Sequence, residues 1–137
     1  MSDIATLRRI LRSAHTLAVV GLSGDWRRPS FSVARYMQEH GCRIVPVNPN
    51  YPEILGEKSY PDLKSIPFPV DLVDVFRKPE DCAPIARDAV AIGAKTFWMQ
   101  IGVVNEEAGR IAREAGLEVV MDRCVKIEYA RLFGGPG

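Results

Sequence analysis

The residues best suited to chemistry stand in one short stretch, residues 21–30, which reads GLSGDWRRPS. Its glycines let the backbone turn tightly and approach a phosphate closely, and its serines add hydroxyl donors. Its arginines carry planar, permanently charged groups that suit phosphate oxygens. The stretch therefore predicts a phosphate site, the alternative being an ordinary loop with solvated arginines. The candidate contacts are Gly21, Ser23, Arg27, Arg28 and Ser30.

The stretch differs from the dinucleotide fingerprint G-x-G-x-x-G, because position 23 is serine. The fingerprint also calls for an acid after the second strand, or an arginine for a 2′-phosphate. Residues 45–51 read VPVNPNY, and no charge follows until Glu53. Both nicotinamide cofactors are therefore disfavoured. The uncharged rim at residues 47–49 either lines an adenine, through apolar contact and an amide, or is a turn enforced by proline.

Two later stretches offer further binding groups. Residues 76–78 read FRK, which suits either a flat ring with a phosphate or a strand end with solvated bases. Gln100 follows an apolar run, and an amide at the carboxyl end of a strand can point into a cleft. Trp98 and Met99, just before it, are expected in the core instead.

The sequence offers no catalytic set and no metal pattern. His15 and His40 each precede an expected strand, so they should lie at the amino ends, away from the cleft. No C-x-x-C motif is present. Cys82 and Cys124 could approach the cleft, although free cysteines are most often small buried side chains. We therefore predict no catalytic residue and no metal ligand.

The elements that must position these residues alternate between strand and helix. Short apolar runs predict strands, and helical spacing with caps predicts the helices between them. The alternation predicts an α/β, Rossmann-like, doubly wound sheet of five parallel strands with helices on both faces. In such sheets ligands bind at the carboxyl ends of the strands. The expected strands are residues 16–20, 43–47, 70–76, 95–99 and 117–121.

Composition limits the function further. The chain has 137 residues, 47% of them hydrophobic, with a net charge of +1. We expect a single domain over residues 1–137, with a loose tail at 133–137, and no binding of nucleic acid through bulk charge. No apolar run is long enough for a membrane span. Three cysteines do not suggest a disulfide framework, so the cytoplasm is expected. The sequence leaves open whether the chain forms a homodimer or binds a protein partner.

The third strand carries two acids, Asp71 and Asp74. Because acids are expensive in a central buried strand, we predict that this strand lies at an edge of the sheet.

Six stretches, in order along the chain, carry a family resemblance: AVVGLS (18–23), RPSF (28–31), PVNP (46–49), DVFRKPE (74–80), WMQIGVVNEEA (98–108) and VVMDRC (119–124). They resemble the small CoA-binding proteins that consist of a lone Rossmann-like domain. That domain is similar to the N-terminal CoA-binding domain of the succinyl-CoA synthetase α subunit. In the synthetase the phosphorylated histidine belongs to another domain, so ligase activity is not implied here.

The resemblance implies a strand order of 3-2-1-4-5 and a CoA molecule lying across the carboxyl ends of the strands. It also implies which residues contact the ligand. Gly21, Leu22 and Ser23 would meet the phosphates, with Arg27 and Arg28 nearby, and Val47, Asn48 and Pro49 would contact the nucleotide end. The far wall would be formed by Phe76, Arg77 and Lys78, and Gln100 with Gly102 would lie toward the pantetheine arm.

We therefore predict non-catalytic binding of coenzyme A or an acyl-CoA, as a carrier, a sensor or a partner module. The alternative is an enzyme, either an NADP-linked reductase or an acyl transferase that uses Cys82 or Cys124. The missing charge after the second strand counts against the reductase, and the missing base counts against the transferase. A structural partner domain that has lost its ligand is a third hypothesis.

Overall fold

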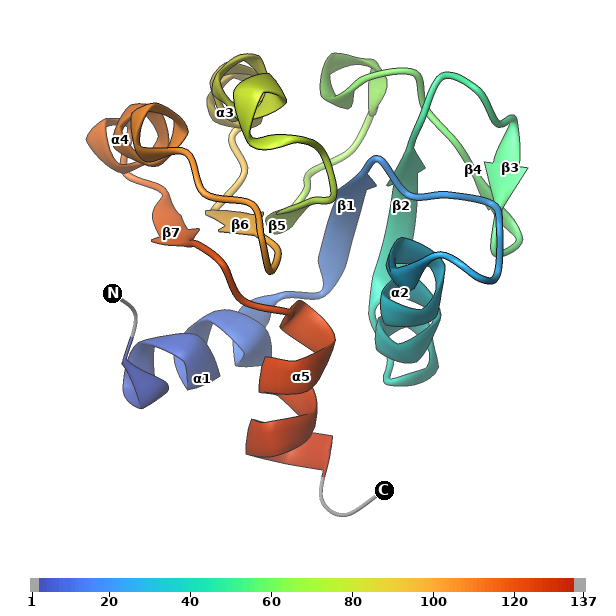
Figure 1. Ribbon diagram of the computed structural model, residues 1–137, viewed down its shortest axis with the longest axis horizontal. Helices are drawn as coiled ribbons and strands as arrows, with labels where there is room; N and C mark the ends of the chain where they lie inside the picture. The colour runs from blue at the N-terminus through green and yellow to red at the C-terminus, as the bar shows by residue number, and fades with distance from the viewer. Residues whose placement is uncertain (1–2, 135–137) are drawn as a thin grey trace.

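The computed structural model describes residues 3–134, which form a parallel sheet of five strands in the order β2-β1-β5-β6-β7 (Figure 1). The strands fall where apolar runs stand in the sequence, and four of them are almost wholly buried, as expected when helices cover both faces, whereas β7 at the edge is only partly buried. The predicted fold class is confirmed. The strands are β1 (Thr16–Val20), β2 (Arg43–Val47), β5 (Leu72–Val75), β6 (Thr96–Met99) and β7 (Glu118–Val120).

Helices cover the two faces of this sheet (Figure 1). One face carries α3 (Cys82–Ala91), which follows a 3-10 turn at Pro79–Asp81, and α4 (Glu106–Glu114). The other carries α1 (Ile4–Ser13), α2 (Pro29–Glu39) and α5 (Val125–Tyr129), which continues as a π-helical turn at Ala130–Gly134. The predicted tail at 133–137 thus overlaps the end of that turn, and residues 135–137 lie outside the described part of the chain.

The helix starts follow local capping chemistry. The side chains of Asp3 and Asn105 each accept a backbone N–H in the first turn of α1 and α4. Helix α2 begins at Pro29, which needs no N–H partner at that position, and its N-cap residue Arg28 gives no side-chain cap. In the first turn of α2 the N–H groups of Phe31 and Ser32 both donate to Arg28 O, at 3.1 and 3.5 Å, which leaves the Ser30 N–H without a partner among residues 3–134.

Beyond β2 the chain makes a small edge structure. A two-stranded hairpin joins β3 (Glu53–Ile54) to β4 (Glu57–Lys58), and a 3-10 turn follows at Leu63–Ser65. Tyr60 then forms an isolated parallel bridge with Val47 of β2. This bridge takes the edge position next to β2.

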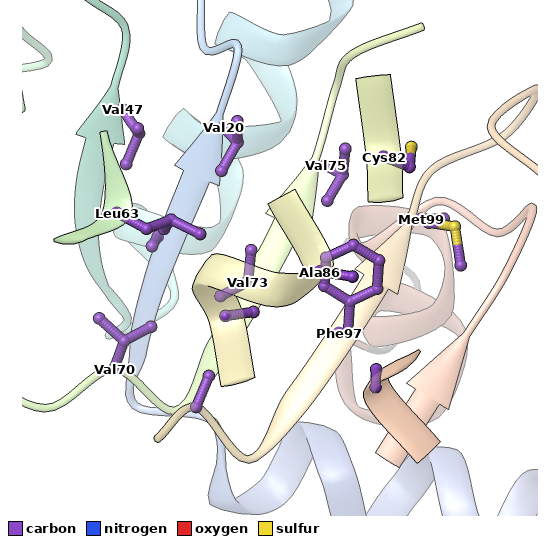
Figure 2. Packing of buried hydrophobic residues seen from close by; sticks show 14 of the residues in the cluster. Val20, Val47, Leu63, Val70, Val73, Val75, Cys82, Ala86, Phe97 and Met99 are labelled. Carbon is purple, nitrogen blue, oxygen red and sulfur yellow. The ribbon is translucent and has the colours of Figure 1, made fainter. Parts of the chain in front are cut away.

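Each face of the sheet has its own hydrophobic core. On the α3 and α4 face, valines of the strands pack with Leu63 and with Cys82 and Ala86 of α3 (Figure 2). On the opposite face, Trp98 is fully buried among residues of α1, α2 and α5. Among residues 3–134, no helix is long and apolar enough to cross a membrane.

The third predicted strand is not at an edge, and both the edge prediction and the order 3-2-1-4-5 are wrong. Strand β5 lies between β1 and β6, so the predicted strands, numbered along the chain, stand in the order 2-1-3-4-5. The reason is that both acids have partners. Asp71 Oδ2 accepts the N–H groups of His15 at 3.0 Å and Thr16 at 2.9 Å. Asp74 accepts a hydrogen bond from Gln100, and its burial raises its pKa to about 7, which weakens the penalty for burial.

Candidate functional site

Three adjoining hollows follow the carboxyl ends of the strands. The β2-side hollow, about 400 Å³, shares Gly21 with the central hollow, about 290 Å³. The central hollow shares Pro29 and Phe76 with the β6-side hollow, about 580 Å³. Because neighbouring hollows share walls, they make one groove, with its middle between β1 and β5. That is where the connection leaving β1 runs toward β2 and the connection leaving β5 runs the opposite way, toward β6, which is the usual ligand position in open α/β sheets.

The central hollow is built from the turn after β1 and the start of α2. It is lined by Gly21, Ser23, Arg28, Pro29, Ser30 and Phe76. The N–H of Ser23 donates to Ser30 Oγ at 3.0 Å, so the Ser30 hydroxyl remains able to donate its own proton. The positive end of the α2 dipole adds to these donors. The hollow is thus suited to an anion.

The two arginines of the turn have different surroundings. Arg28 lines the central hollow. Arg27 instead makes a bidentate pair with Asp25, with Nε and Nη2 each 3.0 Å from a carboxylate oxygen. Arg27 lines none of the three hollows. The structure therefore brings Arg28, and not Arg27, to the groove.

The β2-side hollow contains the uncharged rim Val47, Asn48 and Pro49. The Asn48 amide is already used, because Nδ2 donates to Leu22 O at 3.0 Å and Oδ1 accepts Asn50 N–H at 2.9 Å. The side chain of Leu22 is fully buried in the core, so only its backbone is near the groove. The same hollow carries acids that the sequence analysis did not select, namely Asp62, Glu80, Asp81 and Asp88.

The turn after β5, which carries Phe76, Arg77 and Lys78, lies between the hollows. Phe76 lines the central and β6-side hollows, and Arg77 lines the two outer ones. Arg77 Nη2 lies 3.2 Å from Asp81 Oδ2, an exposed pair that leaves its other donors available. Lys78 lines the β6-side hollow.

The β6-side hollow is largely apolar. Gln100 and Gly102 line it, as does Cys124. The N–H of Gly102 is already bonded to Asp122 Oδ1 at 2.7 Å. Several of the residues that line it were not predicted from the sequence, in part because packing decides which side of α2 or α5 faces the groove. Those residues are Pro29 and Val33 of α2, Pro79, Ile101 and Val103, and Ile127 of α5.

Other reactive groups lie elsewhere. His15 and His40 line a separate hollow with Cys42 at the amino ends of the strands. Cys82 is fully buried, and its burial, with Asp81 and Glu80 nearby, raises its pKa to about 11. Within residues 3–134, no group of three or more His, Cys, Asp or Glu side chains could hold a metal ion.

The thiols should differ sharply in reactivity. Burial raises the pKa of Cys42 as well as that of Cys82, whereas Cys124 is partly exposed in the β6-side hollow. We expect one thiol to react rapidly with a disulfide reagent at pH 8 in the folded protein, and all three to react after denaturation. The Cys124→Ser variant should lose the rapid phase. Rapid labelling that persists in this variant would show that a buried thiol becomes exposed.

Comparison with known proteins bears on what the groove holds. Residues 15–130 match the family described as CoA binding domain. The uncharacterized protein YneT of Bacillus subtilis (strain 168) is 42% identical over 126 residues, which are 92% of this chain and 93% of YneT. A hypothetical protein from Pyrococcus horikoshii OT3 superposes with a TM-score of 0.94 at 39% identity, over 97% of this chain and 94% of that one.

A more distant match is to one segment of a large enzyme. Over 59 residues, 42% of this chain, the identity to an ADP-forming acetate–CoA ligase of Archaeoglobus fulgidus is 37%. Those residues make up 9% of the ligase, so the likeness concerns one segment only. The family match spans most of the chain, both sides of the groove included. The chain therefore belongs to the CoA binding domain family.

Proposed function

We propose that this protein binds coenzyme A or an acyl-CoA along the groove, without catalysing a reaction on it. The observation that carries the proposal is the central hollow, where a glycine turn, the α2 N-terminus and Arg28 meet. These groups recognise a pyrophosphate through backbone donors, a helix dipole and a guanidinium. Membership of the CoA binding domain family supports the choice of CoA among pyrophosphate-containing ligands.

The two outer hollows suit the two ends of this ligand. With the pyrophosphate in the middle, the uncharged rim of the β2-side hollow receives the adenosine. The free 2′-hydroxyl of the ribose and the adenine amine are donors, and the carboxylates of that hollow can accept from them. The pantetheine arm then extends into the apolar β6-side hollow. The exposed side chains of Ile101 and Ile127 on its rim offer apolar contact to an acyl group.

The groups around the groove favour binding over catalysis. Nucleophilic catalysis requires a base within hydrogen-bond reach of the nucleophile. Cys124 is the thiol that lines the groove, and the two histidines lie at the opposite end of the strands. A role as carrier, sensor or partner module follows from binding without turnover.

The direct test is titration calorimetry of the purified protein with CoA, acetyl-CoA and NADPH. We expect CoA and acetyl-CoA to bind with micromolar or tighter affinity, and NADPH to bind at least about tenfold more weakly. Binding should also raise the melting temperature, because a ligand that binds only the folded state stabilises it. No heat and no thermal shift with CoA at millimolar concentration, together with a response to NADPH, would overturn the proposal.

Replacing Arg28 by alanine should weaken CoA binding by about tenfold to a hundredfold, the loss expected for a charge-assisted contact with a phosphate. Arg27→Ala is the matched control, because it removes the same charge from the neighbouring position. Since Arg27 is held by Asp25 away from the groove, its loss should change the Kd by less than about threefold. Calorimetry on both variants measures the difference. Equal losses would mean that only the net charge of the turn matters.

A further inference from the structure

A buried pair of polar side chains lies beneath the β6-side hollow. Gln100 lines this hollow, and its Nε2 donates to Asp74 Oδ1 at 2.5 Å. Asp74 is in β5, paired with Trp98 of β6, and is only 1% exposed. Its second oxygen, Oδ2, is sealed from solvent and has no partner among the described residues. Gln100 therefore connects a buried carboxyl group to the groove.

The Gln100 amide is planar, so its two ends point in different directions. While Nε2 faces Asp74, the carbonyl oxygen Oε1 must point elsewhere. No group among residues 3–134 donates to Oε1, and it is not among the sealed atoms without a partner. Gln100 is 4% exposed and lines the β6-side hollow, so its unsealed Oε1 is available to a ligand there. Gln100 thus presents a hydrogen-bond acceptor to the groove.

We propose that Asp74 is a positioning residue, which holds the Gln100 amide with Oε1 toward the β6-side hollow and makes the site select a ligand arm that offers an N–H there. The inference rests on the proposed function, because the ligand arm is the pantetheine of CoA. Pantetheine carries two secondary amides, and each has one N–H donor. A charged carboxylate can only accept, so it fixes which end of the Gln100 amide it meets.

Protonation of Asp74 removes this constraint. A neutral carboxyl group can donate to Oε1, and the Gln100 amide can then turn its N–H groups toward the hollow. Burial raises the pKa of Asp74 to about 7, against the opposing effect of the hydrogen bond from Gln100. The acceptor should therefore be held toward the hollow at pH 8 and no longer be held there at pH 6.

Other charged or titratable groups flank β5 and the elements beside it, and they must be controlled for. They lie at the start of α2, at both ends of β5, just before β6, and just before and within α5. These groups are Arg28, Asp71, Arg77, Lys78, Lys95, Arg123, Cys124 and Glu128. All of them are unchanged in Asp74→Asn, so that variant isolates the titration of Asp74.

The first arm of the experiment needs no ligand. In the free wild-type protein, the side-chain ¹⁵N resonance of Gln100 is followed by NMR from pH 5.5 to 8.5. We expect it to titrate with a midpoint near 7, and to be flat in Asp74→Asn. Asp71→Asn, immediately before β5 and away from the hollow, is the matched control and should keep the titration. A Gln100 resonance that does not titrate in the wild type would overturn the inference, whether or not CoA binds.

The second arm measures the Kd for CoA over the same pH range. We expect the wild-type affinity to fall about threefold to tenfold more than that of Asp74→Asn between pH 8 and pH 6, the loss expected for one hydrogen bond. The variant accounts for titration of the ligand phosphate, and its melting curve shows that it is folded. Equal pH profiles in two proteins that both bind CoA would overturn the positioning role. Failure of the wild type to bind CoA would overturn the proposed function and this ligand preference, and the first arm would still decide whether Asp74 controls the amide.

Discussion

Replacing Gly21 by alanine is expected to lower the free energy of unfolding by about 3 kcal/mol and to weaken CoA binding by about tenfold or more. Gly21 has φ +86°, a conformation that residues with a side chain rarely adopt. An added Cβ would lie 2.6 Å from the carbonyl oxygen of Phe76 and 3.0 Å from Cδ of Arg77. Relieving this overlap moves the β1 turn away from the β5 turn. Both turns form the central hollow, so stability and binding fall together.

Gly93→Ala separates the cost of the positive φ from the cost of the steric overlap. Gly93 also has a positive φ, +74°, but an added Cβ there meets no atom within 4 Å. It should therefore show the conformational strain alone, about 1 kcal/mol, with CoA binding unchanged. Thermal unfolding should show a drop of about 10 °C for Gly21→Ala and a much smaller one for Gly93→Ala. Equal drops would mean that the contact with Phe76 is relieved at no cost.

Most elements of the fold were predictable because local chemistry marks their ends. Strand β1 is an apolar run that stops at Gly21, and Asn105 accepts a backbone N–H at the start of α4. The predicted bounds of β1 and β2 agree with the structure, and those of β5 were too long by two residues at the amino end and one at the carboxyl end. These features depend on residues close together in the chain.

The strand order could not be predicted, because it depends on distant partners. Asp71 is compensated by backbone groups of His15 and Thr16, and Asp74 by Gln100, 26 positions later. Without those partners in view, an acid in a strand indicates an exposed edge. The short bridge at Tyr60 that takes the edge position has no strand signature in the sequence.

The candidate site was predictable in location and less so in detail. The rule for parallel sheets directs attention to the turns after the strands, and the three hollows of the groove lie at those turns. The rule does not say which side chains of those turns point into the groove. Arg27 and Arg28 are equivalent in the sequence, yet the Asp25 pair holds one of them outside the groove. The contacts that α2 and α5 contribute depend on helix phase and packing, which no single stretch encodes.

Asp74→Asn is expected to stabilise the protein at pH 8 by up to about 4 kcal/mol, with the gain shrinking as the pH falls toward 4. Burial raises the folded-state pKa of Asp74 from 3.8 to about 7. Between these two values the folded state holds a proton that the unfolded state has released. Stability therefore falls as the pH rises through this window, and above it the wild type carries the full cost of a buried carboxylate. Asparagine has no such titration.

Urea unfolding of both proteins at pH 4.5, 6 and 8 measures this difference. Asp71→Asn, immediately before β5, is the control, because there the carboxylate accepts two backbone N–H groups and lies 3.7 Å from Lys95. Its loss should destabilise the protein at pH 8. A gain for Asp74→Asn that does not change with pH, or a loss at pH 8, would show that the carboxylate is better compensated than its single hydrogen bond suggests. A variant that is more stable and yet binds CoA with a weaker pH dependence than the wild type would separate what Asp74 does for the ligand from what it costs the fold.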